Sequence, residues 1–203
     1  MSAIPSPLLR LGRRLRDDCR GLAAVEFAFI LPLMLVLTFA MIETTDGIAI
    51  DRKTDITART LSDLIAAMQP ASAGGGTVSV TDSDIRDAFV ASASIMAPYP
   101  ASVIEAKVSQ IRIDADGNAT VVWSKGWINN EITTGHEPGA VTLKASQQGL
   151  LTPNTYLIWS EVKYFYRPKV PYLMQAGFLA PHEGFSRPRY APCISYGATN
   201  CAS

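Results

Sequence analysis

The chain has 203 residues with 18 basic and 18 acidic side chains, a length that allows one domain or a small domain plus an anchor. Five of the basic residues and two of the acidic ones, Asp17 and Asp18, fall within residues 1–21, so this leader has a net charge of +3 and the remainder −3. A mildly acidic body lacks the basic face that nucleic-acid binding requires, so we expect no nucleic-acid partner. The basic residues of the leader are Arg10, Arg13, Arg14, Arg16 and Arg20.

A long apolar run follows the leader, from Leu22 to Ile42, and Glu26 is its only charged residue. Its 21 residues match the roughly 20 that cross the hydrocarbon core as a helix. The alternative, a secretory signal peptide, has a shorter apolar core of roughly 7–15 residues and a small-x-small cleavage site, for which Thr38-Phe39-Ala40 is a weak candidate. We therefore predict a single membrane-spanning helix, with the arginine-rich leader in the cytoplasm and residues 43–203 outside.

The helical pattern continues beyond the membrane. Its apolar residues recur at i, i+3, i+4 and i+7: Leu61, Leu64, Ile65 and Met68. This spacing predicts that residues 43–69 continue the helix as an amphipathic stalk that ends before Pro70. Pro32 should bend the span, and Gly47 should weaken the helix just outside it. The Gly-rich residues 70–76 are expected to form a hinge.

Residues 77–170 have the pattern of a small α+β head. Val78–Val80 reads as a short strand, and Thr81 or Asp82 can cap a helix over about Ser83–Met96. Asp84, three residues after Thr81, completes a capping-box pattern. We expect one helix in the head.

An antiparallel sheet is expected to follow. Ser102–Asp114 and Ala119–Trp127 flank Asp116-Gly117-Asn118, a strong hairpin signal. Tyr156–Arg167 is a third candidate strand, whereas residues 129–152 are too polar and Gly-rich to assign. The Pro-rich tail, residues 171–203, is expected to be mostly loop. The predicted fold class is therefore α+β: a long membrane-spanning helix, an amphipathic stalk, and a head with one helix and an antiparallel sheet.

Three cysteines fall on the two sides of the predicted membrane. Cys19 lies in the leader, facing the reducing cytoplasm, while Cys193 and Cys201 lie outside, where a disulfide is permitted. We expect these two to be bridged; the alternative is a pair of free thiols on a loose tail.

The start of the apolar run carries a more specific signature than its hydropathy. The sequence Gly21-Leu22-Ala23-Ala24-Val25-Glu26-Phe27, with a basic leader before it and a long apolar helix after it, resembles the class III signal of type IV prepilins. It is most similar to the TadE/TadG-like minor pseudopilins of the tight-adherence (Tad) secretion system, over about residues 10–68. The ending of the last predicted strand, Tyr164 to Pro168, is also similar to that family. Leu22 stands where the major type IV pilins commonly have phenylalanine.

The resemblance implies that a prepilin peptidase cuts after Gly21 on the cytoplasmic side, which makes Leu22 the first residue and Glu26 the fifth. It also implies an inner-membrane location with a periplasmic head. The implied partners are the peptidase, the lipid bilayer, other Tad pilins or pseudopilins, and inner-membrane assembly proteins.

The residues suggest how such a chain would assemble. The new α-ammonium of Leu22 can pair with the Glu26 carboxylate of a neighbouring subunit, and Phe27–Ile42 can supply apolar contact area. Alternatively, Glu26 reaches the inner headgroups and has no role in assembly. Pro32 also has two interpretations. It could bend the helix so that assembled helices can pack, or it could have no specific role, because proline is more frequent in membrane helices than in soluble ones.

The sequence contains no recognisable catalytic motif. His136 and His182 lie far apart, and no cysteines or histidines have metal-ligand spacing. The acidic pairs Asp82/Asp84 and Asp114/Asp116 read as helix-start and turn residues. We therefore expect no enzyme activity, no cofactor and no metal site.

Two functions remain open on this reading. The first is a minor pseudopilin or assembly component of a Tad-like pilus; the second is an uncleaved single-span anchor that presents a binding head. The Gly21–Glu26 pair separates them, because a plain anchor needs neither residue.

Overall fold

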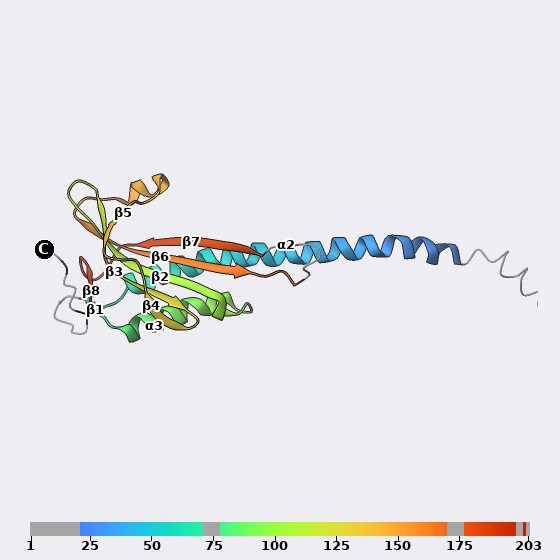
Figure 1. The fold of residues 1–203 in the computed structure, drawn as a ribbon, viewed down its shortest axis with the longest axis horizontal. Helices are drawn as coiled ribbons and strands as arrows, with labels where there is room; N and C mark the ends of the chain where they lie inside the picture. The colour runs from blue at the N-terminus through green and yellow to red at the C-terminus, as the bar shows by residue number, and fades with distance from the viewer. Residues whose placement is uncertain (1–20, 71–77, 170–176, 198–200, 202–203) are drawn as a thin grey trace, which may run out of the picture.

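A computed structural model describes residues 21–70, 78–169, 177–197 and 201. The chain consists of a long amino-terminal helix and a head built around its second half (Figure 1). This arrangement of a long apolar helix followed by a small head with a helix and an antiparallel sheet confirms the predicted α+β class. Residues 71–76 of the hinge predicted over 70–76, and residues 1–20 of the predicted leader, lie outside the described residues.

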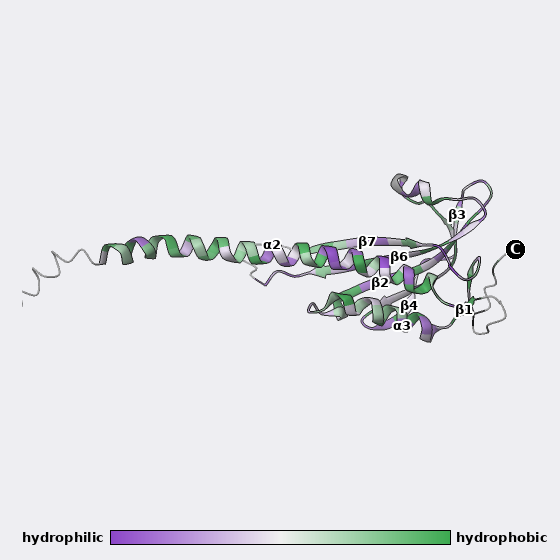
Figure 2. Cartoon of the chain, turned by 180° about the vertical axis from the view of Figure 1, so that it is seen from behind, coloured by the Kyte–Doolittle hydropathy of each residue, from purple (hydrophilic) through white to green (hydrophobic). Residues whose placement is uncertain are grey.

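The long helix, α2, runs from Leu22 to Ala66 without interruption, 45 residues and roughly 67 Å. From Leu22 to Ile42 its side chains are exposed apart from the half-buried Ala40, and this half is almost uniformly apolar (Figure 2). The second half carries polar residues on one side and buries the other in the head. The buried apolar residues of this half are Ile50, Ala58, Leu61, Ile65 and Ala66.

The helix continues through both positions where the sequence suggested weakness. Pro32 lies inside α2, and Figure 1 shows no sharp break along the exposed half, so the predicted bend at this proline is not a marked one. Gly47 lies under the ring of Phe178, which would be 3.3 Å from a Cβ added at this glycine. Contact with the head therefore supports the helix where its own propensity is low.

A six-stranded antiparallel sheet packs against the second half of α2. Its order is β4-β3-β2-β6-β7, with the short β5 also pairing with β3. The strands are β2 (Ile104–Ile113), β3 (Ala119–Ile128), β4 (Glu131–Thr134), β5 (Gly139–Val141), β6 (Thr155–Tyr166) and β7 (Phe178–Ser186). The predicted hairpin is formed by β2 and β3, and Gly117 adopts the positive φ of 85° that its turn requires.

The second helix, α3 (Asp82–Ala93), lies beside α2. Thr81 is its N-cap and forms a capping box with Asp84, as its sequence predicted. A 3₁₀ turn, η2 (Ser94–Met96), extends it, and another, η3 (Ala101–Val103), leads into β2. Phe89 of α3 stacks on Trp127 of β3 with ring centroids 5.3 Å apart, so α3 and α2 share one core against the same face of the sheet.

The described part of the tail, residues 177–197 and 201, contains more strand than its proline content suggested. Residues 178–186 form β7, which pairs along its whole length with β6, and Ile194–Tyr196 form β8, parallel to β1 (Val78–Val80). The expectation of mostly loop was wrong here, because β7 is an edge strand, where Pro181 can be accommodated without loss of a ladder hydrogen bond. The unassigned residues 129–152 hold β4, β5 and the 3₁₀ segment η4 (Ala145–Leu150).

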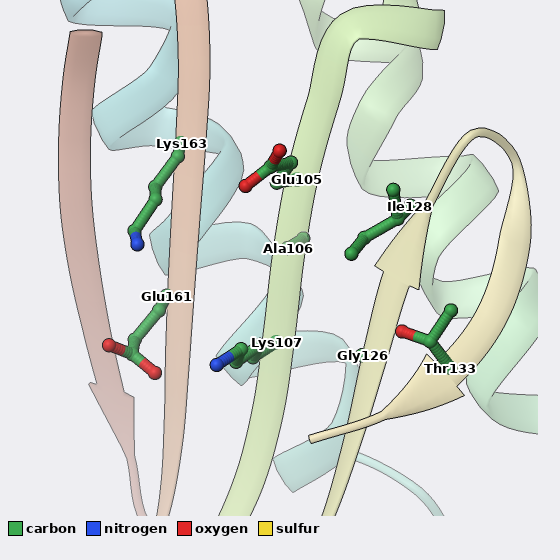
Figure 3. Close-up of a pocket in the computed structure, with 8 residues that line it drawn as sticks. All are labelled: Glu105, Ala106, Lys107, Gly126, Ile128, Thr133, Glu161 and Lys163. Atoms are coloured by element: carbon green, nitrogen blue, oxygen red, sulfur yellow. The ribbon is translucent and has the colours of Figure 1, made fainter. Parts of the chain in front are cut away.

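The face of the sheet away from α2 has an apolar region at one end of the strands and a charged region next to it. At one end a small second core forms from Ile111, Ala119, Leu143 and Trp159. Next to it, opposite charges face each other across the register: Lys107 opposite Glu161, and Glu105 opposite Lys163. Figure 3 shows these four side chains around a hollow on this face.

Candidate functional site: the exposed helix and its junction with the head

The predicted processing position coincides with the start of α2. Gly21 is the N-cap residue and Leu22 the first helical residue. Gly21 has φ −79°, a value open to any residue, and a Cβ built on it meets nothing within 4 Å. The fold therefore places no steric demand on glycine at this position.

The predicted assembly residues lie on the part of α2 that projects from the head. Phe27 is 58% exposed, and none of the residues in the most apolar stretch of the helix is buried. Glu26 and Pro32 are exposed on the same segment. The structure thus gathers these residues on one bare helical rod that is long and apolar enough to cross a membrane.

A buried carboxylate marks the point where this rod meets the head. Glu43, the first charged residue after Ile42, is only 3% exposed. It accepts hydrogen bonds from the hydroxyl of Tyr166, at the end of β6, and from the backbone N–H of Lys169 at 2.9 Å. A carboxylate removed from water needs such donors. The end of β6 is therefore fixed to the helix directly beyond the apolar run.

A second carboxylate, Asp46, extends this junction. It accepts hydrogen bonds from the ammonium of Lys169 at 2.8 Å and from the hydroxyl of Tyr99 at 3.0 Å. The bond from Lys169, reinforced by that from Tyr99, lowers the pKa of Asp46 below its ordinary value of 3.8. Asp46 therefore stays ionised at neutral pH and holds both partners.

Tyr166 is held in its protonated form. Burial, together with the adjacent Glu43 carboxylate, raises the pKa of its hydroxyl well above the ordinary value of 10.0. The hydroxyl is therefore a donor to Glu43 across the physiological range. Its ring packs against that of Phe178 with centroids 5.3 Å apart, so β6 and β7 both contribute to the junction.

Sequence analysis did not find this junction. Glu43 and Tyr166 are 123 positions apart, and no local pattern links them. Two weak signals were present: a charged residue directly after the apolar run, and the aromatic ending of the last predicted strand.

Further along α2, strand β7 forms a row of polar contacts with the helix. His182 Nε2 lies 2.8 Å from Asp51 Oδ1, and Ser186 donates to Asp63 at 2.5 Å. The guanidinium group of Arg189, just beyond the strand, lies 3.1 Å from Asp63 Oδ1. These contacts make β7, a strand absent from the sequence prediction, a principal partner of the helix.

The two histidines lie on opposite faces of the sheet. His182 faces α2, whereas the ring of His136 stacks on Trp159 at 4.9 Å on the other face, with its Nε2 bonded to Glu161. Within the described ranges, no group of three or more His, Cys, Asp or Glu residues could hold a metal ion. Asp84 and Asp114 have the cap and turn roles expected of them.

The last predicted pair lies at the far end of the head. Cys193 and Cys201 form a disulfide with Cα atoms 5.9 Å apart. It adjoins β8, whose Ile194 carbonyl accepts from the Trp123 indole at 2.8 Å and whose Ile194 N–H donates to Gln110 at 2.7 Å. The disulfide therefore lies in a packed region of the head, far from the exposed half of α2.

Comparison with known proteins bears on the exposed helix and its junction. Residues 21–48 match the model of a family described as TadE-like protein. No curated protein and no solved structure matches the chain. The matched residues run from the N-cap Gly21 through the exposed rod to the Glu43–Gly47 junction. The match confirms the resemblance predicted from Gly21 to Phe27: residues 21–48 of this chain are similar to TadE-like proteins.

Proposed function

We propose that this chain is a minor pseudopilin-like component of Tad (Flp-type) pilus biogenesis, anchored in the inner membrane and processed by a prepilin peptidase after Gly21. The observation that carries the proposal is the bare rod from Leu22 to Ile42, which starts directly after Gly21 and which the described head leaves uncovered. The family match over residues 21–48 supports the same assignment.

Assembly then depends on pairing buried charges. Cleavage after Gly21 creates an α-ammonium at Leu22, and Glu26 lies one helical turn further along. In a bundle of such helices, a carboxylate left without a partner is strongly destabilising, by about 3–5 kcal/mol for a buried pair that is broken. Pairing Glu26 of one subunit with the new amino terminus of the next would therefore set the axial register between them.

The head acts in this proposal as a folded, non-catalytic unit, without a cofactor or metal. Polar side chains of the head near α2 are used in internal contacts, as His182 is with Asp51 and Lys169 with Asp46. It would lie on the periplasmic side, presented by a helix whose leader remains in the cytoplasm.

The first test is the amino terminus and intact mass of the membrane-extracted protein, made with and without a cognate prepilin peptidase. We expect a peptidase-dependent start at Leu22 with the apolar helix retained. Gly21→Ala should abolish processing without disturbing the fold, because a Cβ at this position meets nothing within 4 Å. Gly149→Ala, at a head glycine with equally open surroundings, is the matched control and should be processed normally.

The role of the carboxylate is tested by Glu26→Leu in a piliated strain. Leucine makes the span more apolar and should improve simple anchoring, yet it should reduce assembly. Thr38→Leu is the matched control, since the Thr38 hydroxyl donates to the Met34 carbonyl of its own helix at 2.7 Å. Normal piliation in the Glu26→Leu strain would rule out an assembly role for this carboxylate.

The alternative is an uncleaved anchor that presents a binding head. The hollow in Figure 3 has a cavity volume of only about 40 Å³, well below the roughly 300–1,000 Å³ of small-molecule sites, so it gives this alternative no ready-made binding site. A leader retained in the presence of active peptidase would support this alternative. A start beyond Ala40 would instead identify the span as a signal peptide.

A further inference from the structure

One end of the head lies at the level where the apolar run ends. Tyr166 and Lys169 bind Glu43, one residue beyond Ile42, and Phe178 contacts Gly47, five residues beyond it. At 1.5 Å per residue these contacts lie about 2–8 Å past the end of the run. The headgroup layer of one leaflet is roughly 5–8 Å thick. If Leu22–Ile42 spans the bilayer, as the proposed function requires, this end of the head lies within the headgroup layer.

Two large apolar side chains are exposed at this end. Phe165 is 44% exposed and Leu179 is 49% exposed. They are direct partners in the register of β6 and β7, so they lie side by side. Their chain neighbours Tyr166 and Phe178 face α2, and alternation along a strand places Phe165 and Leu179 on the opposite face. We call this pair the proximal apolar surface.

Basic residues flank the proximal apolar surface. The guanidinium carbon of Arg167 lies 5.6 Å from the centroid of the Phe165 ring. Lys163 is the next exposed residue along β6 and lies opposite Glu105, while the Lys169 ammonium is bonded to Asp46. The carboxylates of the junction, Glu43 and Asp46, are bonded within it, and Glu105 on the outer face lies opposite Lys163. Apolar side chains next to cationic ones suit a headgroup layer, where phosphates meet hydrocarbon.

We propose that the proximal apolar surface rests on the outer face of the bilayer, with Phe165 and Leu179 inserted among the headgroups and Arg167 on lipid phosphates. The membrane is favoured over a protein partner because the surface continues directly from the span. The helix tethers it at this height, so even a weak lipid contact is formed at a high effective concentration. The contact would fix the tilt of the head relative to the membrane.

The test uses the full chain in lipid vesicles. A Cys19→Ser background leaves Cys193 and Cys201 in their disulfide, so one added thiol can carry an environment-sensitive fluorophore. The label is placed at Leu179→Cys and, as a distal control, at Asp116→Cys in the exposed turn at the opposite end of the sheet. A third protein, Leu37→Cys, reports on the span. Quenchers are lipids with a nitroxide at the headgroup or in the acyl chain.

We expect headgroup nitroxides to quench the label at position 179 and to leave the label at 116 unquenched. Acyl-chain nitroxides should quench the label at 37. Quenching at 37 without quenching at 179 would overturn the surface contact while leaving the membrane-spanning helix intact. Absence of quenching at 37 would instead contradict the membrane anchor itself, and with it the proposed function.

A variant tests whether the apolar pair causes the contact. Phe165→Asp, combined with the label at 179, should abolish headgroup quenching there. Val90→Asp replaces another exposed apolar residue, 54% exposed on α3, and should change nothing. Unchanged quenching in Phe165→Asp would show that the tether alone holds the head near the membrane. Self-quenching between labels at 179, in place of lipid quenching, would identify a second copy as the occupant. Either result overturns the proposal.

Discussion

The hydrogen bond from Tyr166 to Glu43 can be tested by removing one atom. Tyr166→Phe keeps the ring and its packing on Phe178 but deletes the hydroxyl that donates to a carboxylate only 3% exposed. A hydrogen bond to a charged group contributes roughly 1.5–3 kcal/mol, and a buried carboxylate that loses a donor incurs a desolvation cost of similar size. Glu43 keeps its bond from the Lys169 backbone, so we expect a loss of about 2 kcal/mol.

The assay is urea unfolding of the full chain in detergent, followed by the fluorescence of the buried tryptophans Trp123, Trp127 and Trp159. The second half of α2 shares its core with the sheet. Separation of the helix from the sheet should therefore be coupled to unfolding of the head. With a slope of about 2 kcal/mol per molar urea, the midpoint should fall by about 1 M. Tyr190→Phe, at a tyrosine 55% exposed, is the control and should shift stability by less than about 0.5 kcal/mol.

A double-mutant cycle with Glu43→Gln isolates the pair. If the hydroxyl acts through the carboxylate, the double variant should lose less than the sum of the two single losses. A midpoint for Tyr166→Phe equal to that of the Tyr190→Phe control would refute the reasoning. Strict additivity in the cycle would assign the loss to some other contact of the hydroxyl.

Three further predictions concern the head and its attachment. The fold lowers the pKa of Asp46 below its ordinary value of 3.8. The ionised Asp46 therefore contributes its full stabilisation above pH 3.8, and this contribution is lost as the pH falls through the lower pKa of the folded state. Asp46→Asn should make the free energy of unfolding less dependent on pH between about pH 5 and pH 2, as measured by urea titrations. Gly184→Ala would place a Cβ 2.6 Å from the Ala58 carbonyl oxygen of α2 and should cost about 1–3 kcal/mol, whereas Gly149→Ala should be near neutral by the same thermal-melt measurement. Thr81→Ala deletes the α3 cap and should cost about 1 kcal/mol, and Thr81→Ser should recover most of it; equal melting temperatures for the two variants would contradict the capping role.

Elements with a strong local cause were predictable from the sequence. Thr81 and Asp84 define the start of α3 by their own hydrogen bonds, and Gly117 supplies the positive φ that the β2–β3 turn needs. The extent of α2 followed from its apolar run and the helical spacing after it. In each case the decisive residues lie within a few positions of the structure that they determine.

The parts that were missed depend on distant partners. β7 contains Pro181 and Gly184, both poor strand residues, and it forms because β6 pairs with it and because a glycine is required where the strand crosses Ala58 of α2. β8 has too few residues to hold a strand alone, and its partner, the predicted strand Val78–Val80, is more than 100 residues away. The junction has the same character, since Glu43 reads as an ordinary polar residue until Tyr166 is placed beside it.

The continuity of α2 has a mechanical consequence. The helix that projects as a bare rod also supplies Ile50, Leu61 and Ile65 to the core of the head. There is no interruption between these two halves of α2 at which one could swivel on the other. A torque or a pull applied to the rod inside a bilayer or a bundle would therefore be transmitted to the sheet as a rigid-body movement. The orientation of the head therefore follows any rotation of the exposed half of α2 about the helix axis.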